Sequence, residues 1–226
     1  QLSKADLVTD MVLEFPDMQG IAGSYYALHD GENTDVAAAL AQQYWPKFSG
    51  DRLPESGTAC TLGLADRLDT LVGIFGIGQA PTGSKDPFAL RRASLAVLRI
   101  IVEKGLDLDL RNCLQVAASQ YPDGTLAENN TEQVLQYMIE RFRAWYQAEG
   151  VSAEVFQSVM ELKPVKPLDL ALRVTAVNRF AQLPESDALA AANKRVSNIL
   201  QKYGAAVPES VREDLFSEPA EKALAT

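Results

Sequence analysis

Side chains that bind metals or act as nucleophiles are scarce in this chain of 226 residues. It holds one histidine, His29, and two widely separated cysteines, Cys60 and Cys113. A structural zinc site takes four Cys or His ligands, and a Cys-His protease pairs a thiolate with an imidazole. A zinc finger, a Cys-His protease and a His-rich metalloenzyme are therefore nearly excluded. Two cysteines without a wider framework predict free, buried thiols in a cytoplasmic protein.

Long apolar runs and an excess of positive charge are also lacking. No segment approaches the roughly 18 unbroken apolar residues of a spanning helix, so no membrane partner is expected. The first residues, QLSKADLVTD, resemble neither a signal peptide nor a natural start, which indicates a piece of a longer protein. The net charge is −9, from 21 basic and 30 acidic residues, so any contact with nucleic acid must be local.

Charge is distributed unevenly along the chain. Residues 1–60 hold three basic and nine acidic side chains, a net charge of −6, whereas residues 61–120 hold seven and six. The basic residues of this middle part are concentrated at Lys85, Arg91, Arg92, Arg99 and Lys104. The middle part is therefore the best candidate for a surface that faces phosphate groups.

The spacing of apolar residues predicts an all-α fold, because they recur every three or four positions with almost no strict alternation. We expect helices over residues 2–14, 17–28, 35–45, 59–75, 86–104, 110–120, 129–148, 151–161, 167–181 and 184–203, with a further short one at 208–216. Gly150 follows an aromatic-rich helix and marks a domain boundary. Residues 1–148 then form one helical domain, and 149–226 form a smaller helical bundle with a frayed C-terminal tail.

The segment DPFALRRASLAVLRIIVEKG carries the clearest local signals of a helix. Asp86 is expected as its N-cap with Pro87 at the first helical position, and Gly105 as its stop. Helical spacing also predicts an apolar stripe formed by Leu90, Val97, Leu98 and Ile101.

His29 and Asp30 end one expected helix, and Asp66 lies inside a later one, LGLADRLDTLVGIF. Metal phosphohydrolases of the HD type bring imidazole and carboxylate ligands together from different helices in this way, and the metal lowers the pKa of a bound water. Such sites use a further upstream histidine, which this chain lacks. The alternative is that the segment from His29 to Glu32 ends a helix in a turn and that Asp66 accepts hydrogen bonds within the core. The missing histidine favours the alternative.

A glycine-bearing loop, GIGQAPTGSKDPFALRR, ends in lysine and opens a helix with two arginines. Lys85, Arg91 and Arg92 could hold a phosphate there, the arginines in bidentate contact. The loop is not a Walker A motif, because TGSKD does not fit GxxxxGK[ST], and Asp86 would repel a phosphate at the helix start. A surface turn followed by a solvated arginine face explains the pattern equally well.

Basic and aromatic residues alternate in the segment RFRAWY. Arg141 and Arg143 flank Phe142, with Trp145 and Tyr146 following. If these side chains are exposed, the aromatic rings could stack on bases and the arginines could hold phosphates. Aromatic residues at this spacing more often belong to a core and leave the arginines in solvent, so the core interpretation is favoured.

The C-terminal part carries scattered cations, among them the pair Lys194 and Arg195 in AANKRVSNIL. A helical module with such cations suits a nucleic-acid-binding bundle. It equally suits an ordinary solvated helix surface, and the spacing does not decide between the two.

The segments EFPDMQG, PTGSKDPFALRR, RFRAWYQAEG and AANKRVSNIL, in this order, resemble the beta subunit of the bacterial heteromeric glycyl-tRNA synthetase. The similarity runs over nearly the whole chain. It implies an HD-like helical bundle over residues 1–148, followed by the start of an anticodon-binding type of bundle over 149–226.

The resemblance also implies a division of labour between subunits. In that family, ATP and magnesium are used on the alpha subunit, within a heterotetramer of two alpha and two beta chains. The implied partners are the alpha subunit and tRNA(Gly). This part of the beta subunit would carry no catalytic residue and no cofactor, and His29, Asp30 and Asp66 would be a relic without a metal.

We therefore expect a cytoplasmic part of an aminoacyl-tRNA synthetase that does no chemistry itself and touches the tRNA backbone. The expected contacts are Lys85, Arg91, Arg92, Arg141, Arg143, Lys194 and Arg195. Two other hypotheses stay open: an HD-type metal-dependent phosphohydrolase, and a purely structural helical scaffold that links catalytic and anticodon-binding parts.

Overall fold

The computed structural model describes residues 2–203 and 215–224, and every regular element in these ranges is a helix. The predicted all-α fold is confirmed, and its HD-like character stays a prediction. The chain separates into two compact units, Gln1–Asn178 and Arg179–Thr226. Within the described ranges, no helix combines the length and apolar character needed to cross a membrane.

The first unit opens with short helical elements. They are η1 (Ala5–Val8), α1 (Asp10–Glu14), η2 (Pro16–Met18), α2 (Ile21–His29) and α3 (Thr34–Gln42). The predicted continuous helix over 2–14 is wrong, because Thr9 is extended and separates η1 from α1. Asp6 is buried there, and its carboxylate accepts a hydrogen bond from the Gly20 amide at 2.6 Å.

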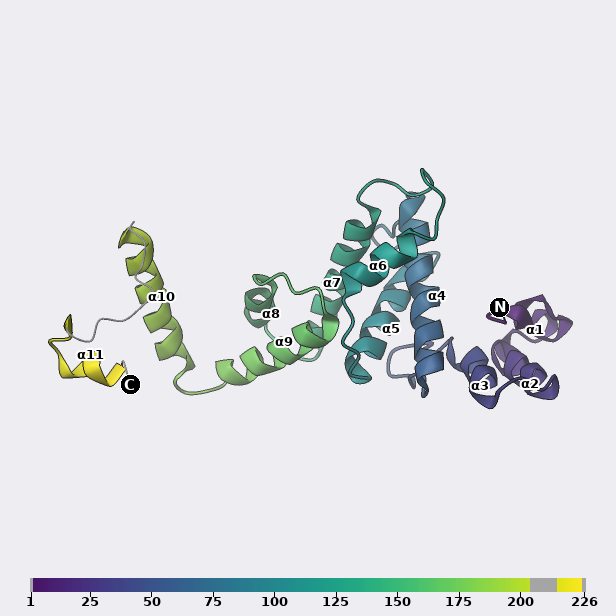
Figure 1. Ribbon diagram of the computed structural model, residues 1–226, viewed down its shortest axis with the longest axis horizontal. Coiled ribbons are helices and arrows are strands. Elements are labelled where there is room, and N and C mark those ends of the chain that lie inside the picture. The colour runs from purple at the N-terminus through teal and green to yellow at the C-terminus, as the bar shows by residue number, and fades with distance from the viewer. Residues whose placement is uncertain (1, 204–214, 225–226) are drawn as a thin grey trace. The chain divides into compact units, whose positions relative to one another are not determined.

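Four further helices form the centre of the first unit (Figure 1). They are α4 (Gly57–Gly76), α5 (Leu90–Glu103), α6 (Leu110–Ala118) and α7 (Asn130–Ala148). Helix α4 packs against the other three. The predicted apolar stripe of α5 is confirmed, since its members are fully buried in the core that these helices share.

The same core continues into α8 (Ala153–Met160) and α9 (Pro167–Ala181). Phe156 of α8 and Leu170 of α9 are fully buried in it, together with Phe142 of α7. Both helices lie beyond the expected domain boundary after residue 148, yet they pack with the helices before it. The boundary itself stays a prediction.

The start of α5 differs from expectation. The helix begins at Leu90, and Ala89 with a φ of 53° takes the N-cap position, so Asp86 and Pro87 precede the helix instead of opening it. The Asp86 carboxylate still reaches the helix end, because its two oxygens accept hydrogen bonds from the Leu90 and Arg91 amides at 2.8 and 3.0 Å. Asp86 therefore caps α5 from four residues upstream, a geometry that the sequence pattern does not distinguish from an N-cap.

The end of α5 is as expected. Gly105 has a φ of 65°, its amide donates to Val102 O, and the Leu106 amide donates to Ile101 O at 2.9 Å. This pair of bonds is the Schellman arrangement that favours glycine after a helix.

The second unit contains α10 (Ser186–Tyr203) and α11 (Pro219–Leu224). Helix α10 confirms the helix expected over 184–203. The helix expected over 208–216 falls almost wholly on residues 204–214, outside the described ranges.

Candidate nucleic-acid interface

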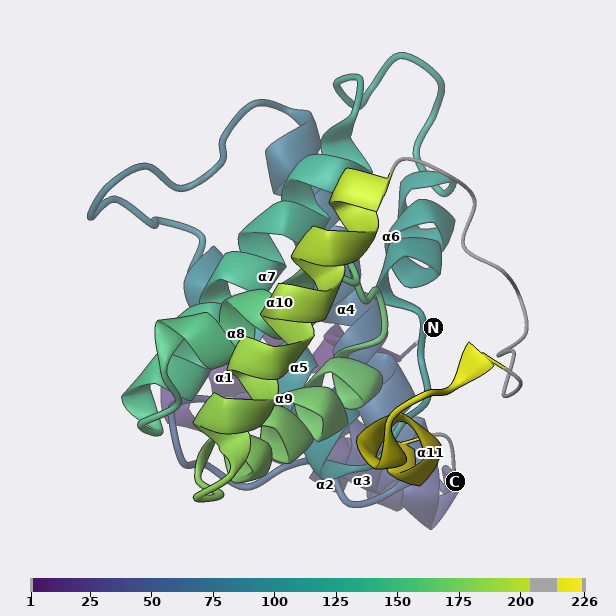
Figure 2. The same ribbon diagram turned by 90° about the vertical axis from the view of Figure 1, so that its left-hand side faces the viewer.

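The segment that joins α4 to α5 projects from the side of the helical bundle (Figure 2). Thr82 and Lys85 form a tight turn there, each amide donating to the other residue's carbonyl. Lys85 is exposed at this turn, and Arg92 is exposed on the first turn of α5. Arg91 is half-buried, and its guanidinium donates a hydrogen bond back to Gly83 O. The loop is thus held against the start of α5 by Arg91.

Two of the free amides at the start of α5, those of Leu90 and Arg91, are already satisfied by the Asp86 carboxylate. Because this carboxylate also places a negative charge there, the helix end does not favour an anion as a phosphate-binding loop does. Any phosphate contact here must therefore come from arginine and lysine side chains.

Replacing Asp86 by alanine is expected to lower the free energy of unfolding by about 1–2 kcal/mol, the usual cost of a lost helix cap. Two amides at the start of α5 would lose their acceptor. Urea unfolding of the purified chain measures the change. Asp123→Ala, at an exposed position of the α6–α7 connection, is the control and should leave the midpoint unchanged.

Two of the expected tRNA contacts come together around one tyrosine. The Arg141 guanidinium lies over the Tyr137 ring, 5.3 Å from its centroid, and both residues are on α7. Burial raises the pKa of the Tyr137 hydroxyl and the Asp86 charge adds to this rise, whereas Arg141 and Arg91 oppose it. Arg91 from α5 and Arg141 from α7 therefore act on the same hydroxyl, although 49 positions separate them in the chain.

Part of this group has unused hydrogen-bonding capacity. The Tyr137 hydroxyl and the Arg141 Nε are buried atoms without a hydrogen-bond partner in the described part of the chain. Two guanidinium groups beside a phenol hydroxyl can bind an anion such as a phosphate by charge-assisted hydrogen bonds. We call Arg91, Tyr137 and Arg141 the arginine–tyrosine cluster.

Arg143 does not join this cluster. Its guanidinium is 3.5 Å from Glu140 and 3.3 Å from Gln157 Oε1, and it lies 5.8 Å from the centre of the Phe156 ring. Arg143 thus faces α8. The favoured core interpretation is confirmed for Phe142 and Tyr146, which are buried, whereas Trp145 is half-buried.

Lys194 and Arg195 lie on α10 in the second unit, where both are exposed. They share one helical face with Asn198 and Lys202. Their contact with tRNA stays a prediction.

The segment from His29 to Glu32 forms the helix end that the alternative interpretation expected. Gly31 has a φ of 82°, its amide donates to Leu28 O, and the Glu32 amide donates to Ala27 O at 2.9 Å. His29 and Asp30 are exposed at this end of α2.

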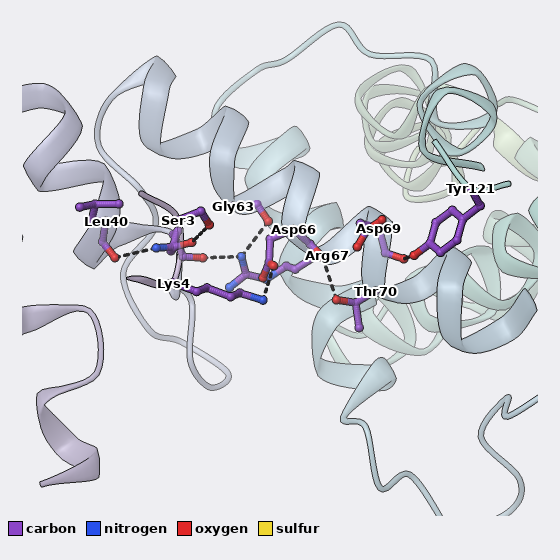
Figure 3. Close-up of polar contacts among 10 residues, drawn as sticks. Ser3, Lys4, Leu40, Gly63, Asp66, Arg67, Asp69, Thr70 and Tyr121 are labelled. Carbon is purple, nitrogen blue, oxygen red and sulfur yellow. Dashed lines mark hydrogen bonds and ion pairs between the residues drawn. The ribbon is translucent and has the colours of Figure 1, made fainter. Parts of the chain in front are cut away.

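Asp66 has a cation as its partner. Its carboxylate forms an ion pair with Lys4, and its carbonyl accepts a hydrogen bond from the Thr70 hydroxyl at 2.8 Å (Figure 3). The expectation that Asp66 accepts hydrogen bonds in the core is therefore wrong for its carboxylate, which is partly exposed and paired with Lys4. In the described ranges, no three His, Cys, Asp or Glu side chains gather as a metal site requires.

The neighbour of Asp66 is a residue that sequence reasoning missed. Arg67 is buried, and its guanidinium donates to Gly63 O at 2.9 Å (Figure 3). It also donates to Gln43 O at 2.7 Å and to Trp45 O at 3.0 Å. Burial lowers its pKa, and the nearby Asp66 charge opposes this. Arg67 ties the end of α3 to α4. The string ADRLD gives no sign of this, because its carbonyl partners carry no side-chain signature.

Comparison with known proteins settles the family. The family model described as "Glycyl-tRNA synthetase beta subunit" matches residues 1–161. The chain belongs to the glycyl-tRNA synthetase beta subunit family. It is 59% identical to the glycine-tRNA ligase beta subunit of Pseudomonas aeruginosa (strain LESB58) over 99% of its length, and 55% identical to that of Psychromonas ingrahamii over 97%. The corresponding protein of Haemophilus influenzae is 55% identical over 99% of the chain.

The chain spans about a third of the length of these relatives, which are covered to 33%, 32% and 32%. The family membership confirms the resemblance that the motifs indicated.

Proposed function

We propose that this chain is part of the beta subunit of a cytoplasmic glycyl-tRNA synthetase and that it holds tRNA(Gly) during ATP-dependent attachment of glycine. The alpha subunit carries out the chemistry, in a heterotetramer of two alpha and two beta chains. ATP and magnesium bind on the alpha subunit.

The observation that carries the tRNA-binding role is the arginine–tyrosine cluster. The Arg141 guanidinium lies over the Tyr137 ring, and Arg91 from α5 lowers the pKa of the same tyrosine's hydroxyl. The exposed Lys85 and Arg92 lie on the adjoining loop and helix turn. Phosphate contacts by such residues supply most of the sequence-independent affinity for a nucleic acid. Arg91, Lys85 and Arg92 also lie in residues 61–120, the part of the chain that is close to neutral overall.

The double variant Arg91→Gln, Arg141→Gln in the intact alpha–beta enzyme is expected to bind tRNA(Gly) about tenfold more weakly at low salt. The slope of log affinity against log salt should become shallower by about 2, because about one counterion is released for each phosphate contact. Fluorescence anisotropy of labelled tRNA over a series of salt concentrations measures both.

Arg111→Gln is the matched control. Arg111 is an exposed arginine on α6 whose guanidinium forks onto Glu132 at 3.2 Å, so its loss should change neither affinity nor slope. If the double variant keeps the wild-type affinity and salt slope, the cluster does not contact tRNA and the scaffold hypothesis is favoured.

A further inference from the structure

Helix α2 is apolar on two sides, but only one side is covered within the described structure. Ala22 and Ala27 are buried, and α2 packs on α3 and η1. The larger side chains of Ile21, Tyr25 and Leu28, spaced as one helical face, are exposed, Tyr25 by 68%. A helix that is hydrophobic all round is normally buried all round. The exposed face therefore indicates a partner.

The elements that pack with α2 also carry exposed apolar side chains. Val8 of η1 is 84% exposed, Leu13 of α1 is 68% exposed, and Phe15 directly after α1 is 61% exposed. Helix α1 packs on η1, and η1 packs on α2, so these residues belong to one packed group of elements. We call Val8, Leu13, Phe15, Ile21, Tyr25 and Leu28 the α1–α2 surface.

Acidic residues flank the α1–α2 surface. Exposed carboxylates occur in α1, in η2 and directly after α2, at Asp10, Glu14, Asp17, Asp30 and Glu32. Two of the three cations in the first sixty residues have other partners: Lys4 pairs with Asp66, and Arg52 lies over the Trp45 ring at 3.5 Å. The third, Lys47, lies beyond α3 in the sequence. An apolar centre with a charged rim is the common anatomy of a protein–protein interface.

The charge decides what kind of partner fits. Phosphates of a tRNA would meet carboxylates here, and a second copy of this chain would place like charges against each other. A protein with an apolar patch and lysines or arginines around it is complementary. We propose that the α1–α2 surface docks the alpha subunit through such a patch. This inference rests on the proposed function, because it takes the chain as the beta part of an alpha–beta enzyme.

The experiment uses the full-length beta subunit with its alpha subunit. Hydrogen–deuterium exchange of peptides that cover residues 7–28 is compared in beta alone, in beta with tRNA(Gly), and in the alpha–beta enzyme. We expect slower exchange only when the alpha subunit is present. Protection in beta alone would mean that another part of beta covers the surface, and protection by tRNA alone would mean a nucleic-acid contact. Either result overturns the proposal.

The variant Tyr25→Arg tests the same surface by affinity. The introduced arginine would lie in the α1–α2 surface, opposite the lysines or arginines proposed for the alpha subunit. The repulsion should weaken association of the two subunits about 30-fold, the size of a hot-spot substitution. Leu172→Arg is the matched control, because Leu172 is 63% exposed on α9 and should leave association within about twofold. Both positions are exposed, so circular dichroism should show unchanged melting.

Equal association of the Tyr25→Arg and Leu172→Arg variants would overturn the docking site. The proposed function would survive this outcome if the enzyme still charged tRNA(Gly) with glycine. Absence of glycylation by the wild-type alpha–beta enzyme would instead remove the proposed function itself, and the two failures are thereby distinguished.

Discussion

Replacing Arg67 by methionine is expected to lower the free energy of unfolding by about 3 kcal/mol. The substitution keeps the apolar volume of the side chain but leaves the carbonyls of Gln43 and Trp45 without their donor in a buried region. A buried acceptor that loses its partner costs about 1–3 kcal/mol, and more than one is affected. Burying the guanidinium charge has a desolvation cost, which is also what lowers the pKa of Arg67. The methionine variant no longer has this cost, so the expected net loss of stability stays near the lower end of the summed cost of the unpaired carbonyls.

Urea unfolding followed by circular dichroism measures this loss. The control is Arg173→Met on α9, where an exposed arginine pairs with Asp169 at 2.8 Å and contributes at most about 0.5 kcal/mol. Arg67→Lys should lie between wild type and Arg67→Met, because an ammonium group can reach some but not all of the carbonyls that the guanidinium fork serves. A methionine variant as stable as the Arg173→Met control would show that Arg67 is not the tie between α3 and α4.

Replacing Phe142 by alanine is expected to cost about 4 kcal/mol of unfolding free energy. The ring is fully buried and lies 5.4 Å from the Trp145 ring and 5.1 Å from the Tyr146 ring. Tyr146 in turn lies 6.1 Å from Phe156 of α8. The cavity would thus open where α7 meets α8, and we expect the loss of stability to include loosening of α8.

The control for this loss is Phe48→Ala. Phe48 is largely exposed in the connection between α3 and α4, so its replacement should lower the free energy of unfolding by less than about 1 kcal/mol. Hydrogen exchange of α8 amides in Phe142→Ala should be faster than in wild type. A Phe142→Ala protein that unfolds at the same urea concentration as Phe48→Ala would contradict the placement of this ring in the shared core.

Much of the fold could be predicted because its signals are local. Helical spacing located α4, α7 and α9, and the glycines at positions 31 and 105 end their helices with positive φ as glycine after a helix commonly does. The core role of Phe142 and Tyr146 also follows from spacing alone. Such features depend on residues within about one or two helical turns, so the local string contains them.

The errors arose where a side chain acts over a distance. Asp86 caps α5 from outside the helix, so the Asp-Pro pair gave the helix start four residues too early. The chain turns at Thr9, and the buried Asp6 carboxylate binds the Gly20 amide, so the first expected helix is broken. In both cases the hydrogen-bonding geometry, which periodicity does not carry, sets the outcome.

The string of residues was enough to establish the helical class, the family and the set of cations that could meet tRNA. Which of those cations work together followed from packing: Arg141 on α7 and Arg91 on α5 both lower the pKa of Tyr137, whereas Arg143 donates to Gln157 on α8. The same packing pairs Asp66 with Lys4 and buries Arg67 among carbonyls. The physical reason is that residues two apart on a helix face different neighbours, and the identity of those neighbours is set by contacts between segments far apart in the chain.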